Sequence, residues 1–368
     1  MSEETKTGKL RGLTRKVSGF LRILRRTYHE RRGAQPLDAS QIDRTMLSVL
    51  YRKAAADLGL EVYEIGQALC ISGRGKTFHT WGFSTDLDTS PLYMITEDKL
   101  LIRNLFKEQG FSIPEGRAFD WRDQSEAVEY ALSLGRPCVV KPASFTSGSK
   151  GVTTRLATRS DIARAFRFAG LFAHQVLIEE FIPGHNYRFL IYKGKCISVL
   201  QRDLPAVVGD GASTVLELAE EENRNRIKRS NWQEGDPPWI PLPTDAAALL
   251  HLKRQGFDWK YAPKAGEQVE VWGASSFAFG TTFTEVLDRV HPDQIRAAVQ
   301  AAGAIRMTIA GVDIISSDIE GPRHHILEIN VSPGLKIHYV IRNPEEMKDP
   351  IRTILKDYFE IAAADSNG

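Results

Sequence analysis

Two apolar segments near the end of the chain contain regularly placed oxygen donors, and this pattern most constrains the fold. One segment surrounds Asp313, and the other spans residues 326–335. Successive side chains of an extended strand alternate between its two faces, so Glu328 and Asn330 share a face. A neighbouring strand would place Asp313 opposite them. The pattern therefore predicts a sheet with three oxygen donors on one face.

Two carboxylates and an amide oxygen suit Mg²⁺, which prefers hard oxygen ligands and keeps positions for phosphate oxygens and water. We therefore expect Asp313, Glu328 and Asn330 to form a magnesium cradle for a nucleoside triphosphate. The alternative interpretation is a buried strand that ends in a Pro-Gly turn and contains incidental polar residues.

A second region combines a lysine with small, hydroxyl-rich residues. The apolar stretch 138–142 contains Lys141 and leads into residues 144–152, which include Ser147, Gly148 and Gly151. Glycine lets backbone N–H groups approach a phosphate chain closely, and an adjacent ammonium supplies positive charge. Most loops of this composition are only turns, so this region alone leaves both interpretations open.

A third region, residues 176–184, is an apolar strand with two adjacent carboxylates, Glu179 and Glu180. A carboxylate at a strand end can accept a hydrogen bond from an adenine amino group, while nearby backbone atoms contact the edge of the ring. The three regions together indicate a nucleotide site.

In this order and spacing, the three regions resemble the ATP-grasp superfamily, most closely the ATP-grasp part of the cyanophycin synthetases and of the bifunctional glutathione synthetases. The resemblance extends from about residue 73 to residue 338. It implies an α/β (α+β) chain with the ATP-grasp fold. The expected parts are a basic N-terminal helix (1–33), an N-terminal α/β subdomain (34–110), a small lid subdomain (111–183), a central subdomain with the magnesium site (184–345) and a C-terminal helix and tail (346–368).

The resemblance also implies roles for individual residues. It assigns Lys99 and Lys141 to the α- and β-phosphates of ATP. It assigns the loop 144–151 to a lid over the triphosphate. The adenine is expected to meet the Glu179 side chain and the backbone of Glu180, Phe181 and Ile182. Asn186 stands where the family commonly has an acid for the ribose hydroxyls, and an amide can still bond a hydroxyl.

The activity implied is that of an ATP-dependent carboxylate–amine ligase, which forms an amide or peptide bond through an acyl phosphate and releases ADP and phosphate. Its expected partners are a small-molecule carboxylate and an amine, such as an amino acid or small peptide. Two Mg²⁺ ions are expected, with Glu328 shared between them and Mn²⁺ as a substitute. We expect Arg188, Arg202 and Lys336 around the transferred phosphoryl group or the substrate carboxylate. Solvated surface pairs are the alternative for any single arginine.

The segment 271–281 departs from the family pattern. It lacks the arginine that relatives place here, and it contains Trp272, Phe277 and Phe279. Loss of a cation directed at a phosphoryl group typically costs ~3 kcal/mol unless another cation replaces it. We therefore expect either Arg202 or Lys336 to compensate, or the chemistry to have changed. The three aromatic residues suggest a bulkier or more apolar substrate, or stacking against a ring.

Charge is concentrated in the N-terminal arm. Residues 1–33 contain ten Lys or Arg and three Glu, a net charge of +7, which leaves 2 − 7 = −5 for the rest of the chain. Apolar residues at steps of three and four predict an amphipathic helix. Its stripe is expected to pack on the body or on a second subunit, as in a homodimer. An acidic partner or a membrane surface is the alternative, and we expect no nucleic-acid binding because no aromatic stacking platform accompanies the charge.

Hydrophobic spacing predicts helices over 41–58, 97–110, 125–134, 159–168, 244–256 and 293–308, and a strand over 61–65. The helix over 97–110 is expected to end at Gly110. Its inward residues are expected to be Leu100, Leu101, Leu105 and Phe106. A proline-rich irregular section is predicted over 223–243, which either helps to cover the second substrate or is a mere insertion.

Two other functions remain open: a small-molecule kinase of the same fold, and a non-catalytic nucleotide-binding scaffold. The sequence shows no transmembrane run and no secretory segment, so a cytoplasmic location is predicted. The three cysteines are widely spaced in or beside apolar segments, and we therefore expect neither a disulfide framework nor a zinc site.

Overall fold

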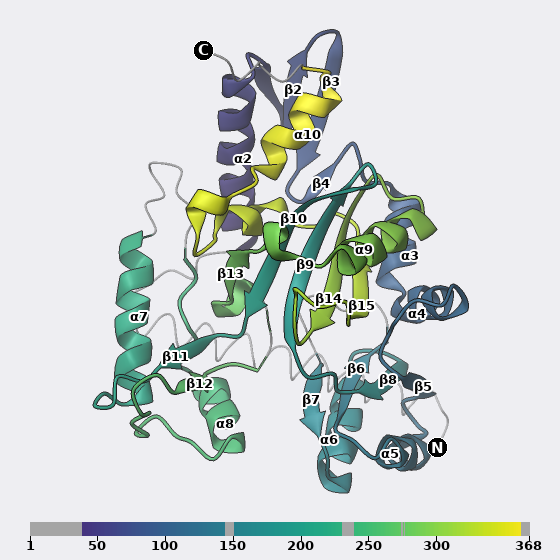
Figure 1. Ribbon diagram of the computed structural model, residues 1–368, viewed down its shortest axis with the longest axis vertical. Coiled ribbons are helices and arrows are strands. Elements are labelled where there is room, and N and C mark those ends of the chain that lie inside the picture. Colours follow the sequence, from purple (N-terminus) through teal and green to yellow (C-terminus); the bar gives the residue numbers. More distant parts are fainter. Residues whose placement is uncertain (1–38, 144–150, 230–238, 274, 276, 362–368) are drawn as a thin grey trace, which may run out of the picture. The chain divides into compact units, whose positions relative to one another are not determined.

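The structure, a computed structural model, describes residues 39–143, 151–229, 239–273, 275 and 277–361 (Figure 1). The predicted basic helix over 1–33, together with Ser147 and Gly148, lies outside these residues. By its backbone contacts the chain divides into two compact units, 1–43 and 44–368. The helices and strands below belong to the second unit, apart from the first residues of α2. The subdomain boundaries expected from the sequence remain predictions.

The first sheet is an antiparallel meander that follows helix α2 (Ala39–Asp57). Its strands are β1 (Glu61–Ile65), β2 (Ala68–Gly73), β3 (Lys76–Trp81) and β4 (Ser84–Thr85). The C-terminal helix α10 (Pro350–Tyr358) packs here, because its apolar side shares one core with Tyr51, Ile71 and Phe78. The helix over 41–58 and the strand over 61–65 predicted from the sequence are confirmed.

The second sheet has the order β5-β8-β6-β7 and is antiparallel throughout. Its strands are β5 (Gly116–Asp120), β6 (Cys138–Pro142), β7 (Thr153–Leu156) and β8 (Gln175–Glu180). Helices α5 (Gln124–Ser133) and α6 (Arg159–Ala169) cover it, and their side chains Val128 and Phe166 share a core with Val140 and Ile178. This sheet places Lys141 and Glu179 on neighbouring strands.

The third sheet has the order β13-β10-β9-β14-β15 and is also antiparallel. Its strands are β9 (His185–Tyr192), β10 (Lys195–Asp203), β13 (Thr282–Glu285), β14 (Ile309–Ser316) and β15 (His325–Asn330). Helix α9 (Pro292–Ala304) lies over one face (Figure 1). Phe189, Val199 and Val312 point into the core on that face. Their neighbours in sequence therefore point to the opposite face.

The remaining elements connect these sheets. They are α3 (Ser90–Glu97), α4 (Lys99–Glu108), β11 (Ala206–Val208), α7 (Val215–Arg229), α8 (Ala246–Arg254), β12 (Gln268–Glu270) and the short 3₁₀ helices η2 (Phe277–Phe279), η3 (Leu287–Arg289), η4 (Leu335–Tyr339) and η5 (Pro344–Glu346). Strand β11 pairs with β12. Helix α4 ends before Gly110, whose φ of 76° fits the predicted C-terminal cap.

Two local predictions are wrong. Helix α7 continues to Arg229, so the section predicted as irregular from residue 223 begins as helix. The Asn223 amide bonds the backbone of Leu242 in both directions, which fixes the helix to the following segment. In α4, Phe106 is buried as predicted, but Leu101 is 50% exposed and Ile102 is buried in its place.

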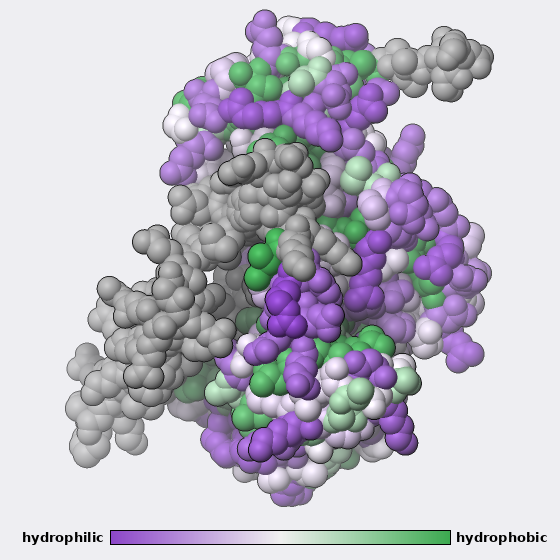
Figure 2. Space-filling model, turned by 90° about the vertical axis from the view of Figure 1, so that its left-hand side faces the viewer, coloured by the Kyte–Doolittle hydropathy of each residue, from purple (hydrophilic) through white to green (hydrophobic). Residues whose placement is uncertain are grey.

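In the described part of the chain, no helix is both long and apolar enough to span a membrane. On the face shown in Figure 2, apolar residues occur in separate groups among hydrophilic ones.

The close approach of β5 to β8 predicts that Gly116 is essential for this sheet. A Cβ at Gly116 would lie 2.5 Å from the Ile178 carbonyl oxygen and 2.7 Å from the Glu179 Cβ. We expect Gly116→Ala to lower the free energy of unfolding by about 1–3 kcal/mol, because backbone atoms must shift. Chemical denaturation measures this. Gly303→Ala is the control, because a Cβ there meets nothing within 4 Å and helical alanine is favourable, so a loss of equal size in both variants would contradict the prediction.

Candidate active site

The three predicted oxygen donors lie together on the sheet face opposite α9. Asp313 pairs directly with Glu328 across β14 and β15, and Gly311 pairs with Asn330. The register shifts between Asp313 and Ile314, where the pairing passes from Glu328 to Ile326. This bulge lets Ile326 and Ile329 both enter the core under α9 while Glu328 and Asn330 face the other way. The predicted placement of Asp313 opposite Glu328 is confirmed.

Two arginines hold the Asp313 carboxylate. Arg188, the cross-strand neighbour of Asp313 on β9, donates to it from Nε and, at 3.1 Å, from Nη2. Arg202 on β10 donates from Nη1 to Asp313 Oδ2 at 2.9 Å. All three side chains are largely buried. Burial raises the pKa of Asp313, and the two guanidinium groups oppose that rise.

The Glu328 carboxylate is kept ionised by its surroundings. Burial alone would raise its pKa, but the ammonium of Lys99, 3.7 Å from Glu328 Oε2, and the charge of Arg188 help to lower the pKa to about 2. Lys99 is the first residue of α4, where Asp98 caps the helix by accepting from the N–H groups of Leu100 and Leu101. A carboxylate of such low pKa is ready to bind a cation at neutral pH.

These residues fit a hard divalent cation. Asn330 Nδ2 lies 3.4 Å from Glu328 Oε1, so the amide and both carboxylates converge on one face. Within the described ranges, no three His, Cys, Asp or Glu side chains gather into a metal site. A cation at this place would therefore depend on two carboxylates, the Asn330 amide and outside oxygens, which is the ligand set typical of Mg²⁺.

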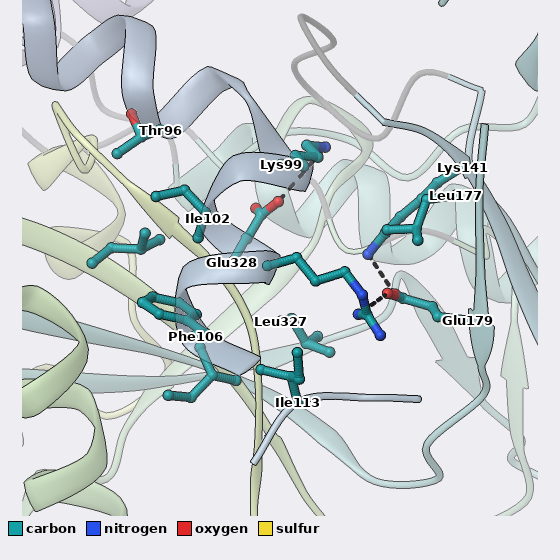
Figure 3. A pocket seen from close by; sticks show the side chains of 13 residues that line it. Thr96, Lys99, Ile102, Phe106, Ile113, Lys141, Leu177, Glu179, Leu327 and Glu328 are labelled. Carbon is teal, nitrogen blue, oxygen red and sulfur yellow. Dashed lines mark hydrogen bonds and ion pairs between the residues drawn. The ribbon is translucent and has the colours of Figure 1, made fainter. Parts of the chain in front are cut away.

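A cleft of about 400 Å³, including space open to solvent, lies between α4, β15 and the second sheet. Lys99 and Glu328 line one side, and Lys141 and Glu179 line the other (Figure 3). Ile102, Phe106 and Leu177 add apolar walls. The cleft thus combines a charged end with apolar surface, as a nucleotide requires.

Glu179 is held by two cations in the structure. Its carboxylate accepts from Lys141 Nζ and, at 3.2 Å, from Arg103 Nη1. Arg103 Nη2 also donates to the carbonyls of Pro114 and Gly116. Arg103 was not predicted from the sequence, because one arginine on an amphipathic helix gives no local signal of a tertiary contact.

The other predicted nucleotide-binding residues in the described part of the chain are not among those that line this cleft. Glu180 points away from Glu179: it accepts from the Glu115 N–H at 2.7 Å and pairs with Arg136 at 2.7 Å. Phe181 donates its N–H to the Pro137 carbonyl, and Asn186 lies on β9 opposite Arg202. Ile182 lies half-buried after the end of β8, and Gly151 has a φ of 76° before β7.

Lys336 lies in η4 and is buried. Its ammonium is 4.2 Å from the Phe277 ring centroid and 5.1 Å from the Phe83 ring centroid, within the range of cation–π attraction. Phe277 packs against Leu200 and Phe283, so Lys336 belongs to the β10–β13 side of the sheet face.

A buried polar cluster on the same side was not predicted. The Ser198 hydroxyl lies 2.6 Å from His338 Nδ1 and bonds Glu285, which also accepts from the backbone of Val199, Val286 and Leu287. Burial, and to a lesser extent the charge of Arg188, lower the pKa of His338 to about 3. His338 is therefore a neutral imidazole at physiological pH.

Known proteins agree with this architecture. Residues 98–203 match the family described as carbamoyl-phosphate synthase L chain, ATP binding domain. The crystal structure of a bifunctional glutathione synthetase from Pasteurella multocida superposes with a TM-score of 0.58 at 22% identity, over 85% of this chain and 43% of that chain. The chain has the ATP-grasp fold, and the resemblance predicted from the sequence is confirmed.

Glutathione biosynthesis bifunctional proteins and cyanophycin synthetases are similar in sequence to this chain. The glutathione biosynthesis bifunctional protein GshAB of Streptococcus mutans is 30% identical over 72% of this chain and 36% of the relative. The corresponding protein of Clostridium perfringens is 28% identical over 69% and 33%. The cyanophycin synthetase of Trichormus variabilis is 28% identical over 66% and 27%. This chain therefore spans about a third of the length of the curated relatives that it matches.

The buried His338 predicts a pH dependence of stability. Its folded pKa of about 3 lies below the usual 6.5, so below pH 6.5 the unfolded chain takes up a proton that the folded chain does not. Above pH 6.5 the lowered pKa has no effect on stability. As the pH falls from 6.5 toward 3, it lowers the free energy of unfolding by roughly 1.4 kcal/mol per pH unit. Chemical denaturation at pH 7.5 and 5.0 should show a smaller loss for His338→Gln than for the unchanged protein.

The control is His185→Gln, at an exposed position on β9. Its loss of stability between the two pH values should follow that of the unchanged protein. Identical losses in all three proteins would show that His338 does not titrate as a buried group.

Proposed function

We propose that this protein is an ATP-dependent carboxylate–amine ligase that forms an amide or peptide bond through an acyl phosphate. The main support is the placement of Asp313 between Arg188 and Arg202, beside Glu328 and opposite the lysines of the cleft. This arrangement brings a candidate cation site and a row of cationic side chains next to a cleft lined by charged and apolar residues. The relatives named for glutathione biosynthesis and for cyanophycin synthesis support the same class of reaction.

ATP is proposed to lie in the cleft with its triphosphate toward Glu328. Lys99 and Lys141 would neutralise the phosphates from two sides, because their ammonium groups face the cleft from α4 and β6 (Figure 3). The adenine would lie near Glu179 and the apolar residues Ile102, Phe106 and Leu177. Arg103 would keep the Glu179 carboxylate in place when Lys141 turns toward a phosphate.

Asp313, Glu328 and Asn330 are proposed to hold Mg²⁺. When bound, Mg²⁺ neutralises phosphate charge and stabilises the charge that develops during phosphoryl transfer. Hydrogen bonds from Arg188 and Arg202 to its two oxygens fix the orientation of the Asp313 carboxylate. Two ions would require that Glu328 serve both, as the sequence resemblance implies.

Arg202 is proposed to replace the arginine that segment 271–281 lacks. It lies on the same sheet face as Arg188, two residues beyond Leu200, and bridges Asp313 to the Ser275 carbonyl. A substrate carboxylate oxygen attacks the γ-phosphorus, and the bond to the β-phosphate oxygen breaks to give ADP. Arg202 would stabilise the negative charge on the moving group, and a buried setting strengthens that effect.

Product analysis tests the reaction class. The purified chain with MgATP should release ADP and phosphate only when both a carboxylate and an amine are present, and mass spectrometry should find the condensed product. Stoichiometric AMP would exclude an acyl phosphate, and a stable phosphorylated product without condensation would indicate the kinase alternative.

Glu328→Gln should lower ADP release by about 10²-fold or more, because the charge that faces the cation is lost while side-chain size is kept. Glu320→Gln, at an exposed residue of the loop between β14 and β15, is the matched control and should retain activity. If Glu328→Gln left both ADP release and the cellular role unchanged, the non-catalytic scaffold would be favoured.

Arg202→Met should lower kcat by roughly 10²–10³-fold with little change in the KM for ATP, because its guanidinium acts at the transferred group. Arg289→Met removes an exposed arginine and should leave kcat unchanged. A rise in the KM for ATP at constant kcat would instead place Arg202 in nucleotide binding.

A further inference from the structure

The order of the strands in the third sheet gives the site two distinct ends. The polar row passes from Glu328 on β15 through Asp313 on β14 and Arg188 on β9 to Arg202 on β10, and β13 follows. The cleft lined by Lys99 and Lys141 is at the β15 end. Given the proposed function, on which this inference rests, the phosphoryl group moves along the row, and the acid that receives it binds on the β10–β13 side.

Aromatic side chains are concentrated on that side. Trp272 stacks on Phe279 with ring centroids 4.5 Å apart and an interplanar angle of 30°. Phe277 contacts the Lys336 ammonium and packs near Phe283 on β13, with centroids 6.3 Å apart. The surface that faces an incoming acid is therefore rich in ring faces and contains a buried cation.

The described residues of segment 271–281, which bears these rings, are held by hydrogen bonds at several points. The N–H of Val271 donates to the Pro205 carbonyl, and Arg202 Nη2 donates to the Ser275 carbonyl at 2.9 Å. Arg226 of α7 donates to the Gly280 carbonyl at 2.8 Å and to the Ile240 carbonyl at 2.7 Å. A binding surface held in this way loses little conformational freedom when a ligand arrives.

Hydrogen-bonding capacity remains at the inner end of the segment. Within the described residues, neither Arg202 Nε nor the Ser275 hydroxyl has a hydrogen-bond partner, although both atoms are buried. An unpaired buried donor costs free energy, and a ligand with acceptor oxygens would remove that cost. An N–H donor and an O–H donor on two residues that contact each other suit a carboxylate.

We propose that the carboxylate substrate is an acid with an aromatic body. Its carboxylate accepts from Arg202 Nε and the Ser275 hydroxyl near the Lys336 ammonium, and its ring stacks on the Trp272–Phe279 pair. One carboxylate oxygen forms a bond to the γ-phosphorus while the bond to the β-phosphate oxygen breaks, which yields ADP and an aromatic acyl phosphate. An amine then attacks the acyl carbon, phosphate leaves, and the amine loses one proton.

Hydroxylamine serves as the test nucleophile, because it converts an acyl phosphate into a hydroxamate whose mass identifies the activated acid. The full chain with MgATP and hydroxylamine is given L-phenylalanine, 3-phenylpropionate, L-alanine, propionate or L-glutamate. The aromatic acids should show a kcat/KM at least about tenfold above that of their aliphatic counterparts, as expected for burial of a phenyl ring. Hydroxamates from L-alanine or L-glutamate alone would overturn the aromatic assignment and leave the ligase proposal standing.

Substitutions at the two stacked residues test where the ring of the substrate acid binds. Trp272→Ala and Phe279→Ala should each lower the aromatic-to-aliphatic ratio of kcat/KM by about fivefold, which is the typical worth of one aromatic pair. Tyr63→Ala removes an aromatic side chain that is 46% exposed on β1 and should leave the ratio unchanged. An unchanged ratio in Trp272→Ala and Phe279→Ala, with both variants folded by circular dichroism, would overturn the assignment.

Calorimetric titration separates the two proposals. In the presence of a non-hydrolysable ATP analogue and Mg²⁺, L-phenylalanine should bind the unchanged protein more tightly than L-alanine, and Trp272→Ala should remove the difference. Such binding without ADP release or hydroxamate would support the aromatic site and overturn the ligase. Absence of both binding and turnover for every acid would overturn both.

Discussion

The arrangement of the site depends on one buried ion cluster, in which the Asp313 carboxylate lies between the guanidinium groups of Arg188 and Arg202. Removing these charges from water is expensive, and only close pairing in good geometry offsets the cost. The three strands that carry these residues, β9, β10 and β14, must therefore keep one pairing register. The charges also favour one strand register over its alternatives, because a slip of one position would place them in the core under α9.

The positive charge of the cluster exceeds its negative charge. Arg188, Arg202 and Lys99 are three cations, whereas Asp313 and Glu328 are two carboxylates. The excess favours an anionic ligand, and the low pKa of Glu328 shows that its surroundings already stabilise its charged form. On the far side of the cleft, the pairing of Glu179 with Lys141 and Arg103 follows the same logic, because a buried carboxylate requires cations nearby.

The sequence was sufficient where local periodicity determines structure. Alternation in the strands predicted that Glu328 and Asn330 share a face and that Asp313 lies opposite Glu328. It could not predict contacts between distant segments. Arg103 meets Glu179 across 76 positions, and Ser198 meets His338 across 140, so no local pattern indicates either pair. Helix α7 extends past Asn223 because of tertiary bonds to Leu242, which outweigh the weak helix preference of asparagine.

Leu327, the extra residue between Ile326 and Glu328, shifts the alternation of side chains in β15 by one position. Before it, even-numbered positions face α9, and after it, odd-numbered positions do. With position 327 occupied, an unbroken strand that kept Ile326 in the core would turn Glu328 and Asn330 beneath α9 and Ile329 away from it. The bulge at this position therefore lets one short strand contribute isoleucines to the core and polar side chains to the opposite face.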